Sequence, residues 1–272
     1  MTWNWRAMRA MIGKDLLQVR QNKMIWLPMV ILPLLIQVIM PLVMVLLPQV
    51  ANESEFDDLA PLLAALPAGA RQAIEALSMR EQWVVFASNY LFAPMFLIVP
   101  LMVSSILASD SFAGEKERHT LEALFYTPVS DVELYVAKLL MAWLPAIAIS
   151  VGSFVTCGIV VNAAGYGIVG RLFFPAPHWW PMVFWLAPAM SLLGLGVTVL
   201  ISSRAKTAMQ AQQMGGVLVL PVVALMAGQS AGLLFLGSGL IWGIGALVWI
   251  IGLWLAWVGG KTFSRSAMIT RI

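Results

Sequence analysis

The chain has 272 residues, of which 61% are hydrophobic and only 11% are charged, and its formal net charge at pH 7 is +3. A soluble domain usually carries about 25% charged residues, so this composition excludes an ordinary soluble enzyme and indicates a polytopic membrane protein. The single cysteine, Cys157, excludes a disulfide within the chain. The basic stretch 3–23 lacks the short apolar core and cleavage site of a signal peptide.

Residues 1–23 predict an amphipathic helix that lies in the membrane interface. The apolar residues recur at helical spacing on one face: Trp5, Met8, Ile12, Leu16 and Val19. Arg6 and Lys14 fall on other faces. This pattern is typical of an interfacial helix, and it fits equally well a basic anchor that fixes the topology.

Six apolar segments follow, each about 20 residues or longer, the length that crosses a bilayer as a helix. They lie at roughly 24–48, 84–109, 135–161, 182–202, 213–236 and 240–260. We therefore expect an all-α fold with one six-span transmembrane domain over residues 24–272. Ser130 and Glu133 have capping-box spacing, which predicts a sharp start of the third span. Only residues 237–239 separate the last two spans, which allows a tight hairpin or a re-entrant segment.

The distribution of positive charge predicts the orientation. This topology puts 13 of the 16 Lys and Arg residues on one side. By the positive-inside rule, both termini and the segment 110–134 are then cytoplasmic, as in a multi-pass protein of the cell inner (plasma) membrane. The acidic loop 49–83 is external, with a short surface helix expected over about 70–83. This loop is either a solvated cap or an external gate or partner contact.

The segment 114–128 is a dense charged island in this apolar sequence. Its start reads Gly-Glu-Lys-Glu-Arg, and Pro128 ends it. Residues 115–126 predict about three helical turns with an apolar face of Leu121, Leu124 and Phe125, and the proline then stops the helix. A short helix between two spans can act as a lever on which a soluble partner pushes.

This segment resembles the cytoplasmic signature of ABC transporter permeases of the type-2 export class. The residues that carry the resemblance are Glu115, Glu117, Arg118, Thr120, Leu121, Glu122, Leu124, Thr127 and Pro128. Lys138 matches a lysine about ten residues further on, whereas His119 stands where the family usually has glycine. A weaker match lies at residues 211–213 with Pro221. The layout of an interfacial helix, six spans and internal termini is similar over nearly the whole chain.

The resemblance implies a permease subunit of an ATP-driven exporter. The segment would be a coupling helix that docks on a separate cytoplasmic ABC ATPase, with ATP and Mg²⁺ bound to that partner and no cofactor in this chain. The coupling residues would be Glu115, Glu117, Arg118, Thr120, Leu121, Glu122, Leu124, Phe125 and Pro128. The resemblance also implies a second permease copy or a paralogue, in a lipid membrane and without nucleic acid.

The sequence contains weaker signals for a nucleotide site, a metal site and a substrate path. Residues 260–262 look like the end of a phosphate-binding loop, but Leu255 replaces the first glycine and a span precedes them. The two histidines, His119 and His178, fall on opposite sides of the membrane, so no metal site is expected. Three polar side chains at membrane depth are candidates for the substrate path, although such residues more often join helices: Gln37, Asn89 and Gln229.

Two alternative functions stay open at this point. Ser153 with His178 could form a nucleophile pair, which would make the chain an intramembrane enzyme. A membrane scaffold without transport is the other alternative. The lack of Asp, Glu, Lys or Arg deep in any span argues against an ion-driven carrier and fits a greasy, amphipathic or bulky substrate.

Overall fold

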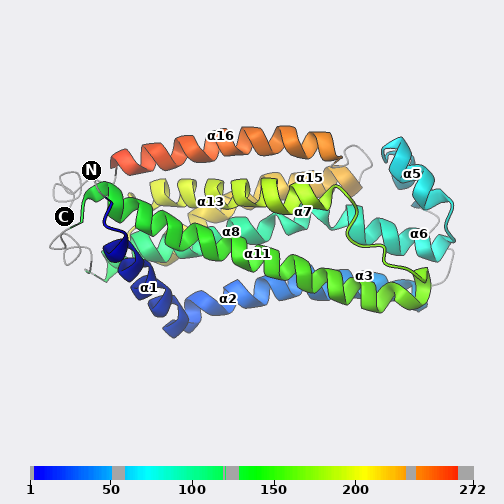
Figure 1. Cartoon of the computed structure of the whole chain (residues 1–272), viewed down its shortest axis with the longest axis horizontal. Helices are drawn as coiled ribbons and strands as arrows, with labels where there is room; N and C mark the ends of the chain where they lie inside the picture. Colours follow the sequence, from blue (N-terminus) through cyan, green and yellow to red (C-terminus); the bar gives the residue numbers. More distant parts are fainter. Residues whose placement is uncertain (1–2, 51–58, 119, 121–128, 231–236, 263–272) are drawn as a thin grey trace.

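The computed structural model describes residues 3–50, 59–118, 120, 129–230 and 237–262. All regular structure in these residues is helical, and six helices are long and apolar enough to cross a bilayer, which confirms the expected fold class. The spans are Lys23–Gln49, Met79–Glu117, Asp131–Val169, Trp179–Ser202, Ala208–Gln229 and Ser238–Lys261. They lie side by side along the long axis of the molecule (Figure 1).

The two ends of the bundle differ in charge. One end, which we call the basic end, carries the N-terminal helix, Lys138 and Lys261, and lies on the left in Figure 1. The opposite end carries the loops before the second and fourth spans.

Helix α1 (Trp5–Gln21) lies at an angle to the spans at the basic end (Figure 1). Asn4 caps its start by accepting a hydrogen bond from the Ala7 amide at 3.2 Å. Its buried residues are Met8, Asp15 and Val19. Trp5 and Leu16, which the sequence places on the same apolar face, are exposed. The buried stripe is therefore narrower than expected and includes a carboxylate.

The first span is irregular. It consists of α2 (Lys23–Leu34), the π-helical η1 (Leu35–Ile39), α3 (Met40–Leu46) and the 3₁₀ turn η2 (Leu47–Gln49). Pro28 and Pro33 lie inside α2, and Pro41 lies at the start of α3. Each proline removes a backbone donor, so the regular helical ladder is interrupted along this span.

A small helical cap covers the opposite end of the bundle. It contains α4 (Leu59–Ala64) and α5 (Ala68–Glu75), whose Leu63 and Ile74 share an apolar cluster with Phe86 of the second span. The helix expected over about 70–83 is in fact two helices, because Ser78 and Glu81 form a capping box that starts a new one.

The second span is the longest interrupted one. It runs through α6 (Met79–Phe86), the π-helical η4 (Ala87–Leu91), α7 (Ala93–Phe96), α8 (Ile98–Ser109), the π-helical η5 (Asp110–Gly114) and α9 (Glu115–Glu117). Its most apolar stretch is 83% buried and that of the fourth span 67%, against at most 28% for the other four. The second and fourth spans therefore form the centre of the chain.

The third span is one helix, α11 (Asp131–Val169). The predicted capping box is confirmed: the Ser130 hydroxyl accepts from the Glu133 amide at 3.3 Å, and the Glu133 carboxylate accepts from the Ser130 amide at 2.9 Å. The helix ends at Gly170, whose φ of +69° favours glycine. It extends beyond the expected apolar segment at both ends because caps, and not hydropathy, set its limits.

The fifth and sixth spans pack against the fourth. That span consists of α12 (Trp179–Pro181), the π-helical η6 (Met182–Leu186) and α13 (Ala187–Ser202). The fifth consists of α14 (Ala208–Gly215), the 3₁₀ segment η7 (Gly216–Val219) and α15 (Leu220–Ser230), and the sixth is α16 (Ser238–Thr262). A Cβ atom on Gly194 would lie 2.7 Å from the Leu101 carbonyl oxygen, so this glycine lets α13 approach α8 closely.

Candidate functional site

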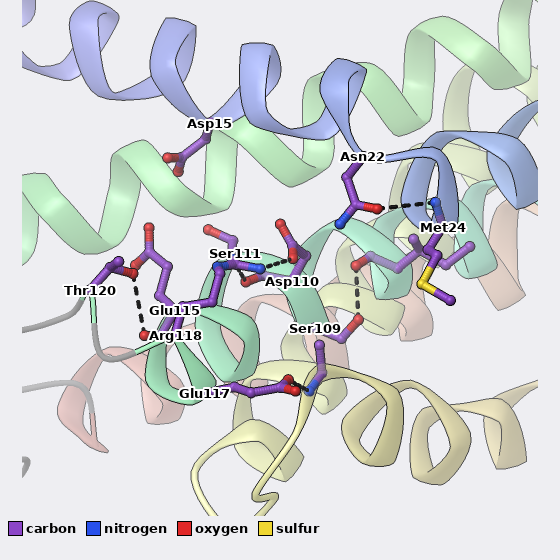
Figure 2. A network of polar contacts seen from close by, with 12 residues as sticks. Asp15, Asn22, Met24, Ser109, Asp110, Ser111, Glu115, Glu117, Arg118 and Thr120 are labelled. Carbon is purple, nitrogen blue, oxygen red and sulfur yellow. Dashed lines mark hydrogen bonds and ion pairs between the residues drawn. The ribbon is translucent and has the colours of Figure 1, made fainter.

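The charged island begins as a direct continuation of the second span. Helix α9 ends at Glu117, Arg118 is its C-cap residue, and the Thr120 amide donates to the Glu115 carbonyl oxygen at 3.0 Å, just beyond the helix. The Thr120 hydroxyl donates to the same oxygen at 3.3 Å (Figure 2). The predicted coupling residues Leu121, Glu122, Leu124, Phe125 and Pro128 lie outside the described residues.

Glu115 is the centre of the described part of this segment. The residue is only 2% exposed, and its carboxylate forms ion pairs with Lys138 of α11 and, at 3.3 Å, with Lys14 of α1. One carboxylate therefore joins the second span to the third span and to the N-terminal helix. Because Glu115 is buried, it can position the island but cannot form its outer contact surface.

Lys138 is as deeply buried as Glu115, with 2% of its surface exposed. Its ammonium also donates to the Ser111 carbonyl oxygen at 2.7 Å and to the Ser111 hydroxyl at 3.3 Å. It lies 5.5 Å from the centroid of the Phe112 ring, within cation–π range. A buried charge is tolerated when it is paired and its hydrogen-bonding capacity is used, and Lys138 meets both conditions.

Lys14 completes the connection to α1. Its ammonium lies 3.1 Å from Asp15 and 3.3 Å from Glu115, and half of its side chain is exposed. Burial lowers the pKa of Lys14, but the carboxylates of Asp15 and Glu115 together raise it more, so the pKa lies above its ordinary value. Lys14 is therefore charged at neutral pH.

A second ion pair lies beside the first. The Arg118 guanidinium folds back along the helix and donates to the Asp110 carboxylate at 2.8 Å (Figure 2). Gly114 lies beneath this pair: a Cβ atom there would come within 2.8 Å of the Asp110 carboxylate and 3.1 Å of the guanidinium. The glycine that opens the island is thus required by the Arg118–Asp110 pair.

The ion-pair cluster consists of Lys14, Asp15, Asp110, Glu115, Arg118 and Lys138. It contains three carboxylates and three basic side chains, so its formal charges cancel. Such a balance matters because an unmatched buried charge is strongly destabilising. The cluster is therefore a neutral junction of three helices.

Two further carboxylates connect the same region to other helices. Glu117 is exposed and accepts a hydrogen bond at 3.0 Å from the Ala208 amide, at the first residue of α14. This contact places a negative charge at the start of a helix, where it is favourable. Glu133 accepts from the Asn4 amide at 2.7 Å, just before α1. The start of the island is thus in contact with the N-terminal helix and with the second, third and fifth spans.

Asn89 has a structural role at the opposite end of the bundle. Its side-chain amide donates to the Phe173 carbonyl at 3.2 Å and accepts from the Ala176 amide at 2.7 Å. Its own carbonyl oxygen accepts hydrogen bonds from His178 at 2.8 Å and Trp179 at 3.1 Å. Asn89 therefore holds the loop between the third and fourth spans, and its side chain has little capacity left for a substrate.

The other two substrate-path candidates lie elsewhere. Gln37 lies in the first span and is 4% exposed, and Gln229 lies in the fifth and is 1% exposed. Both polar side-chain atoms of Gln229, and the Oε1 atom of Gln37, have no hydrogen-bond partner among the described residues. Among the described residues, no hydrogen bond joins Gln37 or Gln229 to Asn89.

The residues of the alternative enzyme site are engaged separately. The Ser153 hydroxyl donates to the Ile149 carbonyl at 2.6 Å in its own helix, and His178 Nε2 donates to Asn89. Neither hydrogen bond joins the serine to the histidine. Within the described part of the chain, no group of three or more His, Cys, Asp or Glu side chains could hold a metal ion.

Comparison with known families identifies the chain at the level of a family. The family model described as ABC-2 family transporter protein matches residues 83–255, which include most of the second span and all of the third to fifth. No curated protein and no solved structure matches the sequence significantly. Helix α1 and the first span lie outside the matched region, although Lys14 contributes to the ion-pair cluster. The chain belongs to the ABC-2 transporter family and is a membrane-spanning component of a transporter.

Proposed function

We infer that this chain is the permease subunit of an ATP-driven exporter and that the island 114–128 docks on a separate ATPase subunit, which would bind ATP and Mg²⁺. The observation that carries the proposal is the ion-pair cluster at the start of the island. It connects the segment on which a partner would push to the second span, the third span and α1. Family membership supports the same function.

The cluster suggests how a push would be transmitted. A displaced α9 would pull on Lys138, and hence on α11, because the Glu115–Lys138 pair is buried and cannot exchange easily with water. Glu117 would transmit the displacement to α14 through the Ala208 amide. Further along the island, Glu122 and Leu124 would meet the ATPase, while Glu115 would hold the island to the spans.

Orientation and assembly follow from charge and burial. The excess of Lys and Arg at the basic end favours a cytoplasmic location of that end, with both termini inside the cell and the chain in the plasma membrane. The first, third, fifth and sixth spans leave most of their apolar stretches uncovered. Lipid and a second copy or paralogue would cover them, and the translocation path would lie between the two permeases.

The test is a charge reversal on the island. Glu122→Lys should abolish the stimulation of the partner's ATPase activity in a reconstituted complex, while the variant still inserts into the membrane. Glu75→Lys is the matched control: Glu75 is an exposed carboxylate at the opposite end, and it pairs with Arg71 at 2.6 Å. Full stimulation in Glu122→Lys, or equal losses in both variants, would contradict the docking site.

Mass spectrometry of proteins that co-purify with the tagged chain gives an independent check. An ATPase subunit should be recovered with the wild type and lost with the Glu122→Lys variant. A chain that purifies alone and still transports would argue for a different energy source.

A further inference from the structure

A small cavity is lined by residues of the first four spans. Its wall includes Gln37 of η1, Ser88 of η4, and the side chains of Phe96, Phe154 and Cys157. It leaves about 10 Å³ for the centre of a water-sized sphere. A cavity of this size is at the lower limit for one water molecule and too small for a larger ligand.

Two polar atoms in this wall lack a partner. Gln37 Oε1 and Ser88 Oγ are buried, and neither forms a hydrogen bond with any described residue. The two residues are 4% and 3% exposed, respectively. A buried polar group without a hydrogen bond is costly, most of all in a bundle surrounded by lipid. Two such atoms on residues that line one cavity indicate a polar occupant.

The hydrogen bond of Gln37 determines which of its two side-chain polar atoms lacks a partner. Its Nε2 donates to the Phe96 carbonyl oxygen at 3.3 Å. In a regular helix this carbonyl would accept from residue 100, but residue 100 is proline and has no N–H. Gln37 replaces the missing donor, so its amide nitrogen is committed and its amide oxygen needs another donor.

The backbone around the cavity is also unusual. Gln37 lies in the π-helical segment η1 and Ser88 in the π-helical segment η4, so two widened turns from two spans meet here. Single π-helical turns inside α-helices occur frequently at functional sites. The packing of these wide turns leaves the gap that the side chains do not fill.

We propose that this cavity binds one water molecule, which donates a hydrogen bond to Gln37 Oε1 and shares a second with the Ser88 hydroxyl. Cys157, the one cysteine of the chain, lines the same cavity and lies beside this water. The water would join the first and second spans at their most irregular turns, where a bound water can exchange partners when the spans shift. The inference does not depend on the ATPase partner or on the direction of transport.

Radiolytic hydroxyl-radical labelling of the full-length protein in nanodiscs tests the proposal, because a bound water generates radicals in place and oxidises the sulfur beside it. Cys157 should be oxidised rapidly although it is buried. Met29 is equally buried, at 6% exposure, but lies in a different apolar cluster and should react slowly. The double variant Gln37→Leu/Ser88→Ala removes both polar partners and should lower Cys157 oxidation severalfold, with Met29 unchanged.

Oxidation of wild-type Cys157 that is as slow as that of Met29 would overturn the proposal, even if the double variant failed to fold. Thermal unfolding of Ser88→Ala gives a second test, because only a dry cavity predicts a rise in Tm. In a dry cavity the substitution removes an unpaired hydroxyl and should raise the Tm. With water present it removes a partner of that water, so the Tm should stay level or fall.

Discussion

The buried ion pair between Glu115 and Lys138 allows the loss in free energy of unfolding to be predicted when one partner is removed. The substitution Lys138→Met keeps a long unbranched side chain but removes the ammonium, which leaves the Glu115 carboxylate with Lys14 alone at 3.3 Å. Removing one partner of a buried ion pair costs about 3–5 kcal/mol. Lys14 is half exposed and compensates only in part, so we expect a loss near the lower limit, about 3 kcal/mol.

Thermal unfolding in mild detergent, followed by tryptophan fluorescence, can measure this loss. For chains of 150–250 residues, 1 kcal/mol corresponds to about 2–4 °C in Tm, so Lys138→Met should lower the Tm by about 6–12 °C. The double variant Glu115→Gln/Lys138→Met leaves neither charge uncompensated. It should recover most of the lost stability, because replacing a whole buried pair with uncharged residues is often neutral.

Two results would refute this reasoning. The first is a Lys138→Met variant as stable as the wild type, which would mean that the ammonium does not compensate a buried carboxylate. The second is additivity: if the double variant loses as much as the two single variants together, the residues are not coupled.

Three further predictions concern other parts of the chain. Gly194→Ala places a Cβ atom 2.7 Å from the Leu101 carbonyl oxygen and should lower the free energy of unfolding by about 1–3 kcal/mol, whereas Gly152→Ala, with open space around it, should not lower the Tm. Burial lowers the pKa of His178 below its ordinary value of 6.5, and the hydrogen bond to Asn89 raises it by less. The neutral imidazole therefore contributes its full stability above pH 6.5, and this contribution is lost as the pH falls through the pKa of the folded state. Unfolding curves between about pH 8 and pH 5 should show this slope in the wild type and a weaker one in His178→Gln. Lys14→Met should cost only about 0–1 kcal/mol in unfolding experiments, because the side chain is half exposed, yet should reduce ATPase stimulation clearly more than the exposed control Arg9→Met.

The sequence predicted the fold class because hydropathy and caps are local signals. Six apolar segments and the Ser130–Glu133 spacing are visible in short windows, and the structure confirms the six spanning helices and the capping box. The limits of the spans were harder to predict. Polar turns with good caps, such as those at Ser78 and Ser130, extend helices beyond their apolar parts.

The internal contacts of the island could not be predicted in the same way. Glu115 is 23 residues from Lys138 and 101 residues from Lys14, so no helical periodicity connects them. The sequence therefore suggests a solvated charged segment, whereas its first carboxylate is buried. A signal that could have been used is Asp15, a carboxylate within the apolar stripe of α1, because a charge on a buried face requires a partner.

Polar residues at membrane depth posed a different problem. Asn89 and Gln37 look alike in the sequence. Both polar atoms of the Asn89 side chain bind a loop, whereas the Gln37 amide oxygen has no hydrogen-bond partner among the described residues. The role of such a residue depends on which backbone groups nearby lack partners. Those groups are set by prolines and turns on other spans, such as Pro100 opposite Gln37, and tertiary structure is needed to see them.

The position of the rigid and irregular parts supports the proposed coupling. The ion-pair cluster fixes α1, α9 and α11 to one another at the basic end, so a push on the island would move these three elements together. Further along the second span lie the π-helical η4 and Pro94 and Pro100, where the helical ladder is interrupted. A displacement applied at a rigid base would therefore produce bending in the middle of the second span, which is the most buried of the six. Loss of Lys138 should then weaken coupling by loosening the base, even under conditions in which the protein is still folded.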